Sequence, residues 1–282
     1  MQLNPIHVAL ALCAALLTAG PADAQSQLER GKYLAEGLGG CVGCHTERSG
    51  GQPFAGGERF GSDRGPFTAY SPNITPDRET GLGGWSDEQV ITALREGKRP
   101  DGTIIGPPMP IGMYRGMSDT DAKAIVAYLR TVPAVTKKVD KSQYRMPLPQ
   151  SYGPPVTQVA DTPRGDPVKY GAYLAGPIAH CIECHTPQVR GRPDYETQLG
   201  RGGREFPTPA GVAVARNITP HLEHGLGGWS DAEIKRAITQ GISRDGTKLN
   251  PPMDFASYAK ATAQDLDAIV AYLRSLKPLA TP

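Results

Sequence analysis

Two stretches of the chain combine helical hydrophobic spacing with start and stop signals. In the first, apolar residues at 90, 91 and 94 share one helical face. A capping box beginning at Ser86 precedes them, and Gly97 stands where the helix would end. The second stretch repeats this pattern between Ser230 and Gly241. We therefore predict one helix between each serine and its glycine.

A longer helix is predicted to follow each of these. It begins at the polar caps Ser118 and Thr262. Each of these helices has a branched apolar inner face, formed by Ile125, Val126 and Leu129 in one and by Ile269, Val270 and Leu273 in the other.

The predicted helices belong to an internal repeat. Residues 31–35 match 171–175, at a spacing of 140. Downstream the spacing is 144, and the matching segments are 73–76 with 217–220, 81–87 with 225–231, 101–103 with 245–247, and 124–130 with 268–274. Tyr128 and Tyr272 are expected to pack where the last helix of each copy crosses the first, because Gly31 and Gly171 permit close approach.

Each copy contains the pentapeptide C-x-x-C-H, at 41–45 and 181–185. Two thiols on one helical turn can each form a thioether to a vinyl group of the same porphyrin, and the next residue then lies under the iron. We predict two covalently bound haem c groups. Their attachment residues are Cys41, Cys44, Cys181 and Cys184, and their proximal ligands are His45 and His185.

Two other interpretations of C-x-x-C are weaker. A zinc site needs four converging ligands, but the two pairs are far apart in the sequence, with most of a repeat unit between them. A thioredoxin-like redox pair needs neither the following histidine nor a duplicated motif, and no βαβ pattern surrounds it.

The repeat also selects a candidate for the sixth iron ligand. The first copy has no spare histidine after the apolar N-terminus, so its candidates are Met109, Met113 and Met117. Of these, only Met109 has a methionine counterpart, Met253, and both follow a Pro-Pro pair. We predict Met109 and Met253 as axial ligands, against the alternative that they only fill the core.

Other residues near the motifs are weaker candidates. The indole N–H of Trp85 and of Trp229 would suit a haem propionate. Asn73 and Asn217, in the preceding loops, are predicted to line the same pockets. Three histidines remain in the second copy, and solvated loop positions are favoured over a ligand switch or a surface metal site for His180, His221 and His224.

The N-terminus resembles a secretory signal. An apolar run at 6–19 is followed by Ala-Asp-Ala at 22–24, so cleavage after Ala24 is expected. The run is short for a membrane span, no later stretch is a candidate, and we expect no transmembrane segment in the mature chain.

The formal net charge is +2, and no concentrated basic face suggests nucleic acid. A proline-rich, basic stretch at 136–167 is interpreted as a stiff, extended linker.

Taken together, the motifs resemble class I cytochrome c modules, and more narrowly the cytochrome c subunits of periplasmic, membrane-associated alcohol and aldehyde dehydrogenases. The resemblance implies an all-α fold of two tandem modules, each with a few short helices and long loops around a covalent haem. It also implies the axial pairs His45/Met109 and His185/Met253. The expected division is a signal peptide at 1–24, module one at 25–135, a linker at 136–167 and module two at 168–282.

The resemblance implies an electron-transfer protein rather than an enzyme. We expect a periplasmic dihaem cytochrome, free or as a subunit of a complex, that takes electrons from a dehydrogenase and passes them to a cytochrome or terminal oxidase. The alternative is a haem enzyme, such as a dihaem peroxidase or a thiosulfate-oxidising cytochrome, in which one iron keeps an open or labile position. Those dehydrogenase subunits commonly carry three haem modules, whereas this chain has two.

Overall fold

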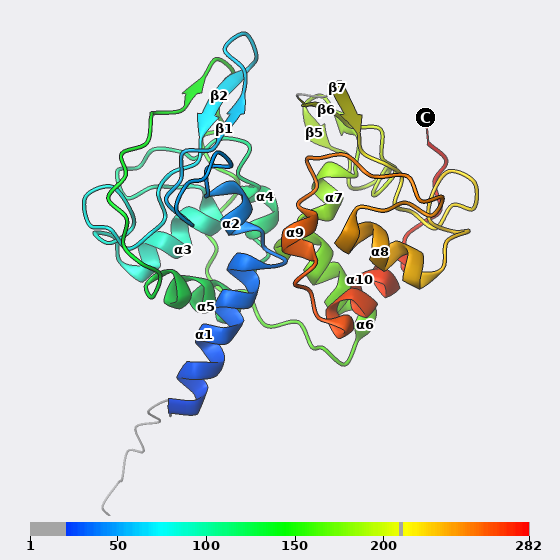
Figure 1. The fold of residues 1–282 in the computed structure, drawn as a ribbon, viewed down its shortest axis with the longest axis horizontal. Helices are drawn as coiled ribbons and strands as arrows, with labels where there is room; N and C mark the ends of the chain where they lie inside the picture. Colours follow the sequence, from blue (N-terminus) through cyan, green and yellow to red (C-terminus); the bar gives the residue numbers. More distant parts are fainter. Residues whose placement is uncertain (1–20, 209–210, 282) are drawn as a thin grey trace, which may run out of the picture.

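The computed structural model describes residues 21–208 and 211–281, arranged as two similar modules side by side (Figure 1). The first module contains α1 (Pro21–Glu36), α2 (Cys41–Cys44), β1 (Arg59–Gly61), β2 (Phe67–Tyr70), α3 (Asp87–Glu96), α4 (Ile111–Tyr114) and α5 (Asp119–Leu129). The second contains α6 (Pro167–Tyr173), a π-helical turn η1 (Leu174–Ile178), α7 (Cys181–Cys184), β4 (Gln188–Val189), β5 (Arg192–Pro193), β6 (Glu205–Thr208), β7 (Gly211–Val214), α8 (Asp231–Gln240), α9 (Phe255–Tyr258) and α10 (Ala263–Ser275). The predicted signal peptide lies almost wholly outside the described residues.

The four capped helices form where the sequence predicts them. Ser86 and Ser230 each complete a capping box at the start of α3 and α8. Gly97 and Gly241 end those helices in the left-handed conformation, with φ of 65° and 64°. The hydroxyls of Ser118 and Thr262 cap α5 and α10. These signals are local, which explains why the sequence was sufficient to find them.

The first and last helices of each module cross at a glycine, as predicted. A Cβ atom on Gly31 would lie 1.9 Å from the carbonyl oxygen of Ala124 on α5. A Cβ atom on Gly171 would lie 1.9 Å from the same oxygen of Ala268 on α10. The adjacent Cβ atoms belong to Tyr128 and Tyr272, so the expected packing of the two tyrosines is confirmed.

The fold is mainly helical, but small antiparallel sheets accompany the helices. One sheet has the order β1-β2-β3, and β4-β5 and β6-β7 are hairpins. The edge strand of the three-stranded sheet, β3 (Gln143–Tyr144), lies in the linker, and its Tyr144 pairs with Phe67 of β2. An all-α class therefore omits part of the structure. These strands are only two to four residues long, and several contain glycine or proline, so they are too short for an alternating pattern to mark them in the sequence.

The linker at 136–167, which we call the strap, runs along the first module before entering α6 (Figure 1). Lys137 binds the Glu47 carboxylate at 2.8 Å, and the Asp119 backbone N–H donates to the Val159 carbonyl at 2.9 Å. The strap is extended, as predicted, and is fastened to the module rather than suspended between modules.

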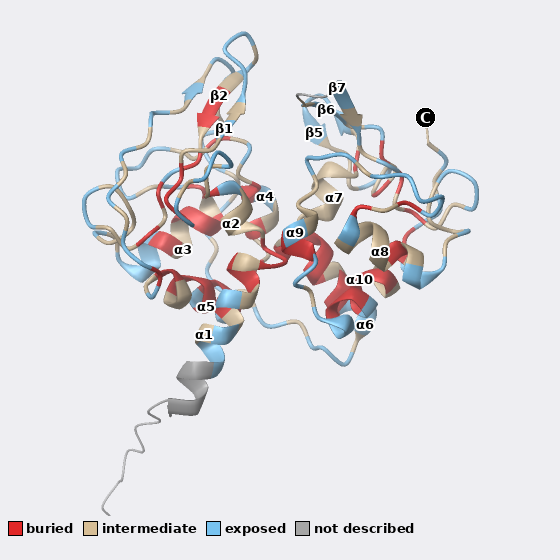
Figure 2. Cartoon of the chain, viewed as in Figure 1, coloured by how far each residue is buried: buried red, intermediate tan, exposed pale blue. Residues whose placement is uncertain are grey.

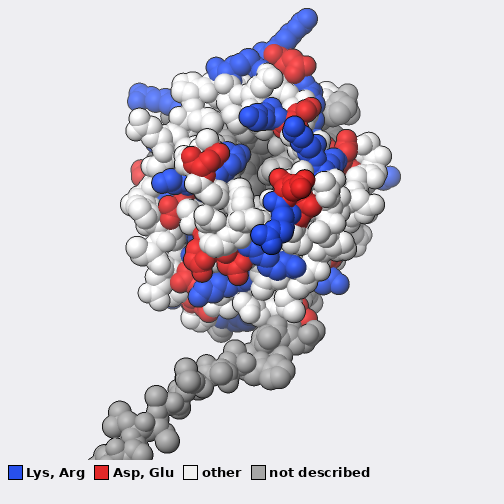
Figure 3. Space-filling view, turned by 90° about the vertical axis from the view of Figure 1, so that its left-hand side faces the viewer, with Lys and Arg blue, Asp and Glu red and all other residues white. Residues whose placement is uncertain are grey.

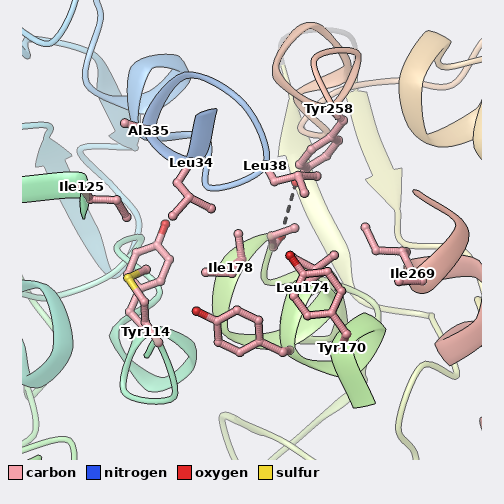
Figure 4. Close-up of a cluster of buried hydrophobic side chains, with 14 of the residues drawn as sticks. Leu34, Ala35, Leu38, Tyr114, Ile125, Tyr170, Leu174, Ile178, Tyr258 and Ile269 are labelled. Carbon is pink, nitrogen blue, oxygen red and sulfur yellow. Dashed lines mark hydrogen bonds between the residues drawn. The ribbon is translucent and has the colours of Figure 1, made fainter. Parts of the chain in front are cut away.

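Buried residues gather between the modules, at η1 and along α10 (Figure 2). Leu34 and Leu38 of the first module meet Leu174 and Ile178 of the second in one apolar cluster (Figure 4). No helix within 21–208 or 211–281 is long and apolar enough to cross a membrane. On the outer face of the first module, basic and acidic side chains are interspersed rather than separated by sign (Figure 3).

Candidate haem sites

The two C-x-x-C-H motifs have the same local structure. Each pair of cysteines occupies a single helical turn, α2 or α7. The backbone N–H of His45 donates to the Cys41 carbonyl at 2.8 Å, and that of His185 donates to the Cys181 carbonyl at 3.0 Å. This turn places both sulfurs and the imidazole together, which is the arrangement that covalent haem attachment requires.

Both histidines are oriented by a backbone carbonyl. Nδ1 of His45 lies 2.8 Å from the carbonyl oxygen of Pro72, and Nδ1 of His185 lies 2.6 Å from that of Arg216. A proton on Nδ1 satisfies this contact and leaves the lone pair of Nε2 free for a metal. Burial lowers the pKa of both imidazoles, which favours the neutral form that a ligand needs. The donor set therefore fits a haem iron.

The cysteines do not have the electrostatics of a redox-active pair. Burial raises the pKa of Cys41 and of Cys181 to about 12, and that of Cys184 to about 11. Reactive thiols have lowered pKa values instead, because nearby positive charge or a helix N-terminus stabilises the thiolate. Among the described residues, no group of three or more His, Cys, Asp or Glu side chains could hold a metal ion. Both observations disfavour the thioredoxin-like and zinc interpretations.

The structure separates the three candidate methionines of the first module. Met117 is 1% exposed and belongs to the apolar cluster. Met113 faces the second module, where its Sδ lies 4.0 Å from the hydroxyl of Tyr195. Met109 is half-buried at the edge of the cluster, as is Met253, and each follows a cis Pro-Pro bond. Ligation of iron by Met109 and Met253 stays a prediction.

Two tyrosines of the strap hold the loop that carries Met109. The hydroxyl of Tyr144 donates to the Pro107 carbonyl at 3.0 Å, and that of Tyr152 donates to the Ile105 carbonyl at 2.8 Å. No sequence pattern indicates this role, because the linker has no counterpart in the repeat against which its residues could be compared.

Asn73 and Asn217 are loop braces. The side-chain amide of Asn73, 3% exposed, donates to the Val135 carbonyl at 2.7 Å and to the Thr80 hydroxyl at 3.0 Å. Its oxygen accepts from the N–H and the hydroxyl of Thr75. Asn217 makes the equivalent bonds to the Leu279 carbonyl and to Thr219. Bracing accounts for both residues, and direct contact with a cofactor stays a prediction.

Trp85 and Trp229 are half-buried, and their loops are clamped by arginines that our sequence interpretation did not single out. Arg130 donates from Nη2 to the Trp85 carbonyl and from Nη1 to the Leu82 carbonyl, both at 2.6 Å. Arg274 makes the same bonds to Trp229 and Leu226. The available signal was the arginine that ends the repeated Ala-Tyr-Leu-Arg segment. The predicted contact of each indole with a propionate stays untested.

The three spare histidines differ. His221 and His224 lie on a surface loop, and each Nδ1 accepts from a backbone N–H, so in the neutral ring Nε2 carries the proton and is not free to bind a metal. His180 is not a solvated loop residue, and that expectation is wrong. Its ring contacts Tyr114 of the other module edge-to-face, with centroids 6.1 Å apart.

Comparison with known proteins agrees with this geometry. Residues 28–133 and 168–277 each match the sequence profile of cytochrome c. The chain belongs to the cytochrome c family. This cytochrome c is 30% identical to a dihaem cytochrome c-type protein of Cereibacter sphaeroides, over 84% of this chain and 81% of that one. Its two modules bind two covalent haem c groups, as predicted.

Other relatives of this cytochrome c are subunits of dehydrogenases. It is 32% identical to the fructose dehydrogenase cytochrome subunit of Gluconobacter japonicus, over 91% of this chain and 54% of that protein. It is 33% identical to the cytochrome c subunit of a quinone alcohol dehydrogenase of Gluconobacter oxydans, over 89% and 55%. The cytochrome thus spans about half the length of these two relatives.

Proposed function

We propose that this cytochrome c is a dihaem electron-transfer protein of the periplasm. It takes electrons from a dehydrogenase and passes them to another cytochrome or a terminal oxidase. The observation that carries the proposal is that both modules have the same arrangement of candidate ligands. Each module has a histidine fixed through Nδ1 and a methionine placed by a Pro-Pro loop.

The chemistry follows from the axial pairs that we propose, His45 with Met109 and His185 with Met253. Haem supplies a one-electron couple when bound, and two protein ligands leave no coordination position for a substrate. The carbonyls of Pro72 and Arg216 fix the two imidazoles, and the strap tyrosines hold the loop that carries Met109. That arrangement suits electron transfer, and a peroxidase would need one open iron.

The relatives support a dehydrogenase as the donor, since those from the two Gluconobacter species are named as dehydrogenase subunits. Their names differ in substrate, so the substrate class of the partner is best found directly. Export follows from the predicted signal, and N-terminal sequencing of the purified cytochrome should begin at Gln25.

The experiment is purification of a tagged cytochrome from its native cells. We expect a catalytic dehydrogenase to accompany it, and both haems to become reduced when the correct alcohol, aldehyde or sugar is added. A free carrier would instead be reduced only after the dehydrogenase is added back. Catalytic turnover of peroxide or thiosulfate by the purified chain alone would contradict the proposal.

A further inference from the structure

The two modules are joined by a reciprocal pair of hydrogen bonds. The hydroxyl of Tyr33 in the first module donates to Oδ2 of Asp265 in the second, at 2.6 Å. The hydroxyl of Tyr173 in the second donates to Oδ2 of Asp121 in the first, also at 2.6 Å. These are equivalent positions of the repeat, exchanged between modules. The interface therefore has approximate two-fold symmetry, and the same contact is made twice.

The carboxylate in each contact is buried, and each tyrosine oxygen both donates and accepts a hydrogen bond. Asp121 is 5% exposed and Asp265 is 1% exposed. The tyrosine oxygens also accept backbone N–H bonds, from Thr262 onto Tyr33 and from Ser118 onto Tyr173, each at 3.2 Å. Each tyrosine is thus hydrogen-bonded to the N-terminal end of the last helix of the other module. Bonds of this kind have a fixed geometry, whereas the apolar cluster beside them does not select one orientation.

The haem motifs lie against this interface. A Cβ atom on Gly43, between the first two haem cysteines, would lie 2.1 Å from Oδ2 of Asp254 in the second module. Next to Cys181, His180 contacts Tyr114 of the first module. Each attachment turn therefore faces the other module rather than solvent alone.

We propose that Tyr33 and Tyr173 are positioning residues for electron exchange between the two haems, a role that rests on the electron-transfer function proposed above. They act through Asp265 and Asp121, which hold the modules in the orientation that brings the two attachment turns together. In the exchange, one electron leaves a ferrous iron and enters a ferric one, and no proton or other reactant is required.

The two contacts are unequal, which gives the proposal a specific signature. Asp121 also binds the guanidinium of Arg30 through two bonds of 2.8 Å. The position equivalent to Arg30 is Tyr170, and Oδ1 of Asp265 and the hydroxyl of Tyr170 have no hydrogen-bond partner among the described residues. Without Tyr173, Asp121 still binds Arg30, whereas without Tyr33 no equivalent side chain binds Asp265. The loss of Tyr33 should therefore slow electron exchange more than the loss of Tyr173.

The test uses the holoprotein and a small-molecule photoreductant in place of the dehydrogenase. After injection of one electron per chain, the rate of exchange between the haems is measured in Tyr33→Phe, Tyr173→Phe and the double variant. We expect a fall of roughly tenfold in the double variant, most of it already present in Tyr33→Phe. The magnetic interaction between the two ferric irons, measured by electron paramagnetic resonance, should weaken in the same order.

Tyr128→Phe is the matched control, because the hydroxyl of Tyr128 also donates to a carboxylate, that of Glu36, but within one module. It should leave both readouts unchanged. Asp265→Asn keeps an oxygen that can accept from the Tyr33 hydroxyl, so this variant should exchange electrons at close to the native rate. If the double variant does not bind haem, Tyr33→Phe alone decides, since it removes a single hydroxyl.

Unchanged exchange and unchanged magnetic interaction in a folded Tyr33→Phe variant would overturn this proposal. So would an equal loss in Tyr128→Phe, which would indicate a general loss of stability. Failure of the proposed function is a different result, since it would appear in the native protein as an iron that binds external ligands.

Discussion

Arg274 lies beside Asp231 at the end of α10, with 2.9 Å between Nη2 and the carboxylate. The same guanidinium donates to two carbonyls of the tryptophan loop, so one side chain fastens that loop to the last helix. We expect Arg274→Met to lower the free energy of unfolding by about 2 kcal/mol. It should also shift the reduction potential of the second haem and leave the first unchanged. Denaturant unfolding and redox titration measure the two effects.

Lys235→Met is the control for that measurement. Lys235 pairs with Asp267 on the surface, without binding a loop carbonyl. It should cost no more than about 1 kcal/mol and shift neither potential. Equal effects of Arg274→Met and Lys235→Met would show that the bonds from Arg274 to the tryptophan loop contribute neither to stability nor to the reduction potential.

Substitution of Asn217 distinguishes a role in stabilising the fold from direct contact with the haem. In Asn217→Ala the chain loses the bond to the Leu279 carbonyl and the acceptor for Thr219. Buried polar groups are left unpaired, so we expect a loss of about 2–4 kcal/mol with the haem absorption bands in place. Altered bands with native stability would instead indicate that the amide contacts the haem.

The helix crossing gives a steric prediction. Gly171→Ala would place a methyl group 1.9 Å from a backbone oxygen that cannot move without α10. We expect a loss of at least about 3 kcal/mol, or failure to fold. Gly112→Ala is the matched control, because a Cβ atom there meets no atom within 4 Å. Thermal unfolding of both variants compares the sites, and similar melting temperatures would contradict the close crossing.

His180 gives a pH dependence. Burial lowers its pKa from 6.5 to about 4. Between these values the unfolded chain binds more protons than the folded one, so stability is complete above about pH 6.5 and falls as the pH is lowered towards 4. Because the ring is partly accessible, we expect a loss of about 1–2 kcal/mol over this window. His180→Asn, which tolerates the left-handed backbone at this position, should remove that part of the slope. An unchanged slope would contradict the lowered pKa of His180.

The sequence predicted what is local or repeated. The caps at Ser86 and Ser230 and the attachment turns follow from short-range patterns, and the Gly31 crossing follows from the repeat, in which a glycine of the first helix recurs together with a tyrosine of the last. The Tyr33–Asp265 bond joins positions 232 residues apart, and nothing local to either residue selects the other. The same holds for Tyr144 of the strap, whose partner Pro107 is chosen by tertiary packing. The short strands were missed because pairing, rather than side-chain pattern, creates them.

Axial ligation can be tested one methionine at a time. Met109→Ala and Met253→Ala should each remove about half of the far-red sulfur-to-iron absorption band of the ferric protein, because each removes one of two equivalent ligands. Met113→Ala, which alters a methionine that faces Tyr195, should retain the whole band. Loss of the band in Met113→Ala instead would overturn the assignment.

The state of both irons in the native ferric protein tests the electron-transfer account most directly. Absorption and electron paramagnetic resonance spectra should show two low-spin haems, with the far-red band present and no rapid binding of cyanide. One high-spin haem, or one that binds cyanide or peroxide rapidly, would contradict the account and favour a haem enzyme.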